Sequence, residues 1–167
     1  MKLFLSLGVL SVLMMLLATG CGDTSARSKK DDQVVAVNQQ DAEMNAAIAK
    51  AHATLTNFIA VLSSPQTNQQ YFLVKGKFTA GDVVEHIWVA DVNFDGKVFR
   101  GVLANDPENI PGLSFKQPVE VPPAQVSDWM FVQDGKLVGG YTSRVLRSRM
   151  TDEERRELDA KIPYRYD

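Results

Sequence analysis

Residues 85–104 read EHIWVADVNFDGKVFRGVLA, and this stretch decides how the chain is expected to fold. Apolar and polar side chains alternate on both sides of Asp95-Gly96, as they do in two half-buried strands. Asp-Gly favours a two-residue type I′ turn, because both central positions of that turn need positive φ. The stretch therefore predicts a β-hairpin with strands at 85–94 and 97–104.

A two-residue turn would also set the pairing of these strands. Phe94 would face Lys97, and Asp91 would face Arg100 as a pair of opposite charges worth about 0.2–1 kcal/mol. One face of the hairpin would then carry the apolar side chains Trp88, Ala90, Val92, Phe94, Phe99 and Leu103. We expect this face to pack against the core.

The letters DVNFDG at 91–96 also match the opening of an EF-hand calcium loop, D-x-[DN]-x-[DN]-G. That loop needs a glutamate at its twelfth position, where this chain has Val102. In a strand, Asp91 and Asp95 would lie about 13 Å apart, whereas calcium binds oxygen atoms at about 2.4 Å. The pattern therefore favours a hairpin over a metal site, and we expect no bound metal.

Other segments predict the elements around this hairpin. Apolar residues recur at three- and four-residue spacing over 41–63, which indicates an amphipathic helix with Asp41 as its N-cap. Thr151 to Glu154 has the spacing of a capping box and predicts a last helix through Ala160. Further strands are expected at 71–78, 118–121, 127–133 and 136–141, with a second Asp-Gly turn at 134–135.

Sequential strands joined by short turns favour an antiparallel sheet. Prolines 122 and 123 limit strand 118–121 to an edge or a bend. The expected fold class is α+β: an antiparallel β-sheet or small open barrel, with the N-terminal helix packed on it and a short C-terminal helix.

The first twenty residues, MKLFLSLGVLSVLMMLLATG, predict an export signal. A lysine precedes an apolar run that is short for a spanning helix and ends in small residues. LATGC, ending at Cys21, resembles a bacterial lipobox, in which cleavage falls before the cysteine. We expect Cys21 to carry a diacylglyceryl group on its sulfur and a third acyl chain, such as palmitate, on its freed amine. A cleaved signal with an incidental cysteine and a retained membrane helix are the alternatives.

The chain is thus divided into a lipoprotein signal peptide at 1–20, a lipidated cysteine and flexible tether at 21–40, and a single α+β domain at 41–167. Residues 22–40 are polar and mixed in charge, as tethers are. Gly22 rather than an aspartate follows the cysteine, which by resemblance to enterobacterial sorting favours the outer membrane, facing the periplasm.

Composition excludes several classes of function. The 167 residues carry a formal net charge of −2, so no basic field indicates binding to nucleic acid. A single cysteine excludes an intramolecular disulfide and a cysteine-rich zinc site, and two histidines make a multi-histidine metal centre improbable. We expect no cofactor.

Candidate functional residues lie at strand ends and on the hairpin. Asn105 and Asp106 follow a predicted strand, and loops at strand ends often carry binding residues. His86 shares the alternating face of Trp88, so a buried, hydrogen-bonded histidine is favoured there over a general base. The candidate binding residues are Asn105, Asp106, Asp128, Trp129, Arg100 and His86.

Several segments, in this order, resemble one family. They are VEHIWV at 84–89, FDG at 94–96, FRGVLANDP at 99–107, VSDWM at 126–130, DGKLVGGYT at 134–142 and RVLR at 144–147. The run from Tyr71 to about Pro163 is similar to the YegJ-like family of bacterial domains of unknown function. The resemblance implies a compact α+β domain, often exported, with no established activity or catalytic residues. Lys116-Gln117-Pro118 departs from the glycine-containing turn that members tend to have there.

Two functions fit these observations. The first is a non-enzymatic, lipid-anchored domain that binds an envelope protein or a cell-wall component through the strand ends near Asn105, Asp106, Asp128 and Trp129. The alternative is a periplasmic hydrolase of cell-wall material that uses Asp106 or Asp128 with His86 as acid and base. The two are distinguished by whether these side chains share an exposed cleft.

Overall fold

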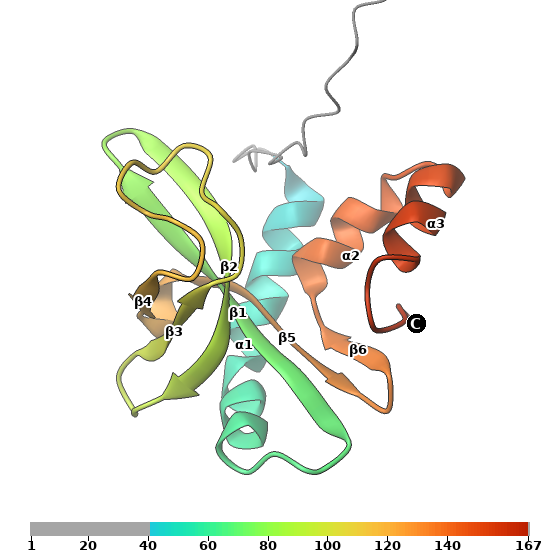
Figure 1. Ribbon diagram of the computed structural model, residues 1–167, viewed down its shortest axis with the longest axis horizontal. Coiled ribbons are helices and arrows are strands. Elements are labelled where there is room, and N and C mark those ends of the chain that lie inside the picture. Colours follow the sequence, from blue (N-terminus) through green and yellow to red (C-terminus); the bar gives the residue numbers. More distant parts are fainter. Residues whose placement is uncertain (1–40, 167) are drawn as a thin grey trace, which may run out of the picture. The chain divides into compact units, whose positions relative to one another are not determined.

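The computed structural model describes residues 41–166, which belong to the unit Val34–Asp167. The predicted signal peptide, Cys21 and the tether lie outside the described residues. The elements are α1 (Ala42–Ser63), β1 (Gln69–Ala80), β2 (Val83–Phe94), β3 (Phe99–Leu103), β4 (Pro118–Val121), the 3₁₀ turn η1 (Pro123–Gln125), β5 (Val126–Gln133), β6 (Lys136–Gly139), α2 (Tyr141–Ser148) and α3 (Asp152–Asp159) (Figure 1).

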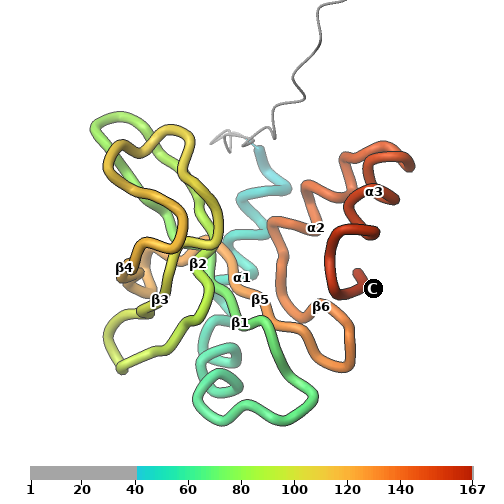
Figure 2. Tube along the Cα trace, in the orientation of Figure 1, coloured from blue at the N-terminus to red at the C-terminus, as the bar shows by residue number. Residues whose placement is uncertain are grey.

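The strands form one open sheet in the order β4-β3-β2-β1-β5-β6, and every neighbouring pair is antiparallel. This confirms the predicted α+β class, and β4 is an edge strand as its flanking prolines indicated. The central β1 pairs with β2 along its second half and with β5 along its first half. In Figure 2, the loop between β3 and β4 lies beside the tip of the β1–β2 hairpin.

Helix α1 begins and packs as its sequence predicts. Asp41 is the N-cap, and its carboxylate accepts a hydrogen bond from the amide of Met44 at 3.1 Å. The buried residues of the helix are Met44, Ala47, Ala51, Leu55 and Phe58. Length and composition would also allow α1 to cross a membrane, a test that core helices pass as well; here the apolar stripe of α1 packs on the sheet.

An aromatic cluster joins α1 to the sheet. The ring of Phe58 is fully buried, stacks on Trp129 with centroids 5.2 Å apart, and also contacts Phe72, Phe99 and Phe131. The Trp129 indole donates a hydrogen bond to the carbonyl of Ala51 at 3.0 Å, so its one polar atom is satisfied inside the core.

The hairpin at 85–104 exists, but its turn is longer than predicted. Phe94 pairs with Phe99 rather than with Lys97, which leaves residues 95–98 in the turn. The cause is the Asp95 carboxylate, which accepts hydrogen bonds from the amides of Lys97 and Val98, both at 2.8 Å. Such bonding of an aspartate to the backbone that follows it competes with the type I′ turn.

A β-bulge changes which side chains of β2 face the core. The pairing shifts between Ala90 and Asn93, where Asp91 has a φ of 53°. An aspartate tolerates this left-handed conformation better than most residues. Before the bulge the core side chains are Ile87 and Val89, and after it they are Val92 and Phe94. The predicted single core face, which included Trp88 and Ala90, is therefore wrong, and so is the Asp91–Arg100 pair, because Arg100 pairs with Asn93.

The second Asp-Gly turn does have the predicted two-residue form. Gln133 pairs with Lys136, and both Asp134 and Gly135 have positive φ. The Asp134 carboxylate is bound by the side-chain amide of Asn68 at 3.0 and 3.1 Å, so it does not fold back on its own turn.

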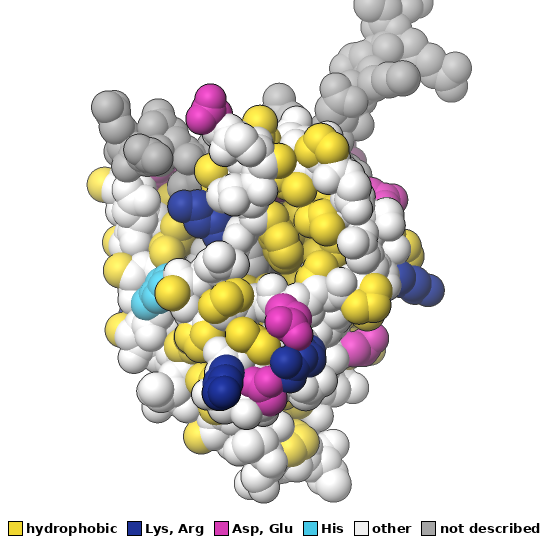
Figure 3. Space-filling model, turned by 90° about the vertical axis from the view of Figure 1, so that its left-hand side faces the viewer, with side chains coloured by type: hydrophobic (Ala, Val, Ile, Leu, Met, Phe, Trp, Pro, Cys, Tyr) yellow, Lys and Arg dark blue, Asp and Glu magenta, His cyan; other side chains and the backbone are white. Residues whose placement is uncertain are grey.

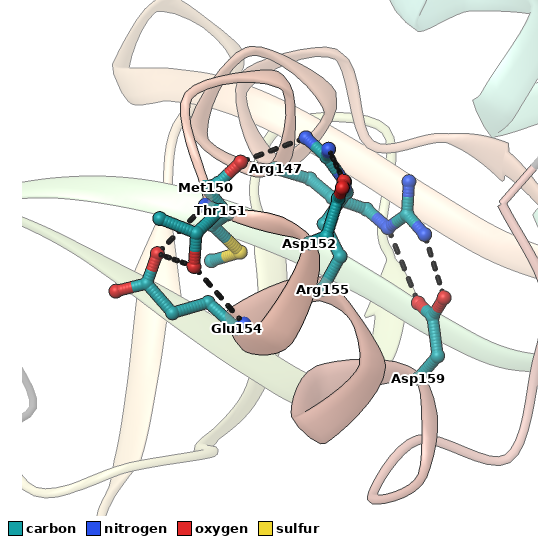
Figure 4. A network of polar contacts seen from close by, with 7 residues as sticks. All are labelled: Arg147, Met150, Thr151, Asp152, Glu154, Arg155 and Asp159. Atoms are coloured by element: carbon teal, nitrogen blue, oxygen red, sulfur yellow. Dashed lines mark hydrogen bonds and ion pairs between the residues drawn. The ribbon is translucent and has the colours of Figure 1, made fainter.

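Helix α2 was not predicted. The strand expected at 136–141 ends at Gly139, and two left-handed glycines then lead into the helix. The capping box predicted for α3 is present: Thr151 and Glu154 each bind the other's backbone amide. Figure 4 shows this capping box and two arginines near it. The guanidinium of Arg147 in α2 binds Asp159 of α3, and that of Arg155 binds the carbonyl of Met150 and the carboxylate of Asp152. The tail then meets β6, where Leu137 donates its amide to the carbonyl of Arg165 at 2.9 Å.

Candidate functional site

Asp128 lies inside the protein rather than at an exposed strand end. Its side chain has no solvent exposure, and its carboxylate accepts four hydrogen bonds: from the amides of Trp129, Tyr141 and Thr142 and from the Thr142 hydroxyl, at 2.6–3.1 Å. Two of these amides are the first of α2, whose N-cap, Gly140, has no side chain. Asp128 therefore caps α2 from a neighbouring strand, which corrects its expected role at a ligand surface.

A buried lysine accompanies this carboxylate. Lys75 pairs with Asp128 across β1 and β5, its ammonium donates to the Thr142 hydroxyl at 3.1 Å, and it lies 4.8 Å from the ring centroid of Trp88. Burial lowers the pKa of Lys75 and raises that of Asp128, while the attraction between the two charges opposes both shifts. The group joins β1, β5 and α2 and serves the fold.

The other candidates of the sequence are spread over separate places. Trp129 is a core residue, as described above. Arg100 is exposed and forms ion pairs with Asp95 and Glu120. Figure 3 shows the side of the molecule that carries β3 and β4, where charged side chains of both signs lie together below a broad group of apolar ones.

Asn105 and Asp106 lie in the β3–β4 loop and are exposed. The Asp106 carboxylate accepts the amide of Phe115 at 2.8 Å and so closes this loop. The buried Glu85 of β2 fastens the same loop by accepting the amides of Glu108 and Asn109 at 3.0 and 2.9 Å. One carboxylate, that of Asp106, therefore closes the loop on itself, and a second, that of Glu85, holds it on the hairpin.

His86 lines a pocket on another part of the surface. The pocket has a cavity volume of about 240 Å³ and lies between α1, the β1–β2 hairpin and the segment where η1 leads into β5. Its polar lining residues are Asn45, His52, Lys77, His86, Gln125 and Ser127. Asp106 and Asp128 are not among the residues that line it.

The state of His86 differs from the hydrogen-bonded histidine that was expected. Its Nδ1 is the only buried side-chain nitrogen or oxygen without a hydrogen-bond partner in the described part of the chain. Burial lowers the pKa of His86 below its usual 6.5, and the charges of Lys75 and Lys77 lower it further. At neutral pH the pocket thus contains a neutral imidazole beside the ammonium of Lys77.

Lys75, Lys77 and Glu85 were missed by reasoning from the sequence. For Lys75 a signal existed: it alternates with Leu73 on β1, so a strand covered on both faces would bury it. Lys77 and the pocket depend on where β5 stops pairing with β1, and no local pattern gives that point. Among residues 41–166, no group of three or more His, Cys, Asp or Glu side chains is placed to hold a metal ion.

Comparison with known proteins assigns this chain to a family. The family model described as "Uncharacterized protein conserved in bacteria (DUF2314)" matches residues 41–164. The chain belongs to this family. The match begins at the N-cap of α1 and ends at Tyr164, so every helix and strand described above is part of the DUF2314 domain.

Two relatives support the assignment. The uncharacterized protein YegJ of Escherichia coli K12 is 31% identical over 139 residues, which cover 83% of this chain and 90% of YegJ. A protein of Neisseria meningitidis serogroup B that is named as an ankyrin repeat protein is 35% identical over 138 residues. The match covers 78% of this chain but only 54% of that longer relative. No solved structure matches the DUF2314 domain of this chain. The YegJ-like resemblance of the sequence is thereby confirmed.

Proposed function

We propose that the protein is a lipid-anchored component of the bacterial cell envelope whose DUF2314 domain binds a partner and catalyses no reaction. The anchor is Cys21, at the end of a signal-like apolar run, and residues 22–40 tether the domain. Absence of an aspartate after the cysteine favours the outer membrane, with the domain facing the periplasm. The partner is an envelope protein or a cell-wall component.

One observation carries the binding function: the acid–base pair of the hydrolase alternative, His86 with Asp106 or Asp128, does not share the pocket. Asp128 is fully buried and already accepts four hydrogen bonds, and Asp106 closes a loop. Of these three residues, only His86 lines the pocket. General acid–base catalysis by a pair of residues needs both within hydrogen-bond reach of one substrate. The Asp128–His86 form of the hydrolase alternative therefore has no geometric support, and the open pocket supports binding.

The test uses the full-length lipidated protein in its own envelope. Labelled palmitate should be incorporated into the wild type and not into Cys21→Ser, and unchanged labelling of that variant would refute the anchor. Crosslinking followed by purification from envelope fractions should recover a defined partner. Failure to recover one, together with turnover of a cell-wall fragment that is lost in Asp106→Ala, would favour the hydrolase instead.

A further inference from the structure

The pocket beside α1 is lined by a positive charge, Lys77, and by no negative one. Its lining includes Lys77 and two histidines, His52 and His86, together with the side chains of Asn45, Gln125 and Ser127, and it contains no aspartate or glutamate. Every hydrogen-bonding group of a lysine is a donor, and a neutral histidine can donate from one nitrogen. A ligand with a carboxylate group complements such a lining, whereas a cationic ligand would find no counter-charge.

The edge of a strand runs beside this pocket. The pairing between β1 and β5 ends at Gly76–Val126, and from Lys77 to Ala80 the strand pairs with β2 alone. The chain before Val126 turns away as η1, and its residues Ala124 and Gln125 line the pocket. The pocket therefore occupies the place that a continued β5 would fill, and β1 is left with an incomplete ladder there.

The outer edges of the sheet are treated differently. Edge strand β4 begins with Pro118 and is followed by Pro122, and β6 is bridged by Arg165 of the C-terminal tail. Prolines and covering segments are the usual means by which proteins prevent further strand pairing. The exposed residues Lys77 and Thr79 of β1 are covered by neither device.

The Nδ1 atom of His86 is buried and has no hydrogen-bond partner in the described part of the chain. A buried polar atom without a partner costs about 1–3 kcal/mol, so proteins rarely retain one without a use. His86 pairs with Lys77 across β1 and β2, at the start of the incomplete ladder.

We infer that the pocket and the β1 edge from Lys77 to Ala80 together bind an extended peptide segment that carries a carboxylate. The peptide adds to β1 as a short antiparallel or parallel strand and takes main-chain hydrogen bonds from that edge. Its carboxylate lies near Lys77, and the exposed Val84 offers an apolar contact. This inference rests on the proposed binding function and specifies its site and the class of partner.

The experiment measures binding of defined peptides to the full-length protein in detergent by fluorescence anisotropy. The probes are a short labelled peptide of alternating valine and threonine that ends in a free carboxylate, the same peptide amidated at its end, and an amidated version with one internal glutamate. Tighter binding of either carboxylate peptide than of the amidated one supports the inference, and the better of the two identifies the source of the carboxylate. Equal binding of all three, or of none, overturns it.

Two further measurements locate the site. Lys77→Gln should weaken binding of the carboxylate peptide by about three- to fivefold, the effect of losing one exposed ion pair. The matched control Lys97→Gln changes an exposed lysine of the β2–β3 turn, outside the pocket, and should leave binding unchanged. Amide protons between Lys77 and Ala80 should exchange more slowly when the peptide is bound, and unchanged exchange there would overturn the strand-addition geometry.

The outcome can be separated from that of the proposed function. If crosslinking recovers an envelope partner equally well with the wild type and Lys77→Gln, and no carboxylate peptide binds, this site is wrong and the binding function stands. If the wild type recovers no partner and turns over a cell-wall fragment, the proposed function itself fails.

Discussion

Replacing Asp128 with alanine should destabilise the domain more than any change at the surface. The substitution leaves the amides of Trp129, Tyr141 and Thr142 without their acceptor, removes the cap of α2 and leaves the Lys75 ammonium without its counter-charge. Breaking a buried charge pair costs about 3–5 kcal/mol. The total stability of a domain is about 5–15 kcal/mol, so the loss is a large fraction of it.

The loss is measured by thermal and urea unfolding followed by circular dichroism. For a domain of this size it corresponds to a fall in Tm of about 12–20 °C. Asp106→Ala is the matched control, because its carboxylate is exposed and accepts one backbone amide; it should cost no more than about 1 kcal/mol. A loss below about 1 kcal/mol for Asp128→Ala would refute the view that this carboxylate organises α2.

A double-mutant cycle separates the charge from the cap. Lys75→Met combined with Asp128→Asn removes both buried charges, and such pairs can often be replaced by neutral groups at little net cost. The double variant should therefore be more stable than the sum of the two single losses predicts, with a coupling of about 1–3 kcal/mol. Simple additivity would show that the two groups do not interact.

The remaining predictions concern the backbone and pH. Gly139→Ala should lower the free energy of unfolding in urea by about 2 kcal/mol or more, because φ is +74° and a Cβ would lie 2.3 Å from a backbone oxygen. Gly135→Ala is the control: φ is +73° but the space around it is open, so the loss should be about 1 kcal/mol. The pKa of His86 is lower in the folded domain than the 6.5 of the unfolded chain. Its contribution to stability is therefore present above pH 6.5 and is lost as the pH falls toward the folded pKa. The stability of His86→Gln, measured by unfolding between pH 7 and 5, should depend less on pH than that of the wild type. The hydrogen bond from Arg149 lowers the pKa of Asp41 to about 2, so the stability from this contact is lost as pH falls from 3.8 toward 2. In a carboxyl NMR titration, Arg149→Gln should move the midpoint of Asp41 up toward 3.8, and an unchanged midpoint would contradict the contact.

Local signals were enough to predict most of the elements of the fold. The apolar stripe and N-cap of α1, the position of each strand and the capping box of α3 depend on residues close in sequence, and the structure confirms them. The Asp134-Gly135 turn formed as predicted because Asn68, distant in sequence, binds its carboxylate. At Asp95-Gly96 the carboxylate instead accepts the amides of Lys97 and Val98 in its own turn, and the same two letters form a longer turn.

The candidate site was less predictable, because it depends on pairings between distant strands. The strand pattern predicts Asp128 at a binding surface, yet its carboxylate is buried and accepts the first two amides of α2, thirteen and fourteen residues further on. Because of the bulge at Asp91, the residues of β2 before it and after it alternate in opposite phase. Trp88 therefore faces away from the main core and packs near Lys75. Neither event leaves a periodic signal in the sequence.

Arg149 binds the N-cap Asp41 and Glu43 in the first turn of α1, at the start of the described domain. These ion pairs are exposed, so solvent and salt reach the contacts that fasten the start of the helix. The apolar stripe that begins at Met44 is buried and is not weakened in that way. Raising the ionic strength therefore loosens the entry point of the domain without loosening its core.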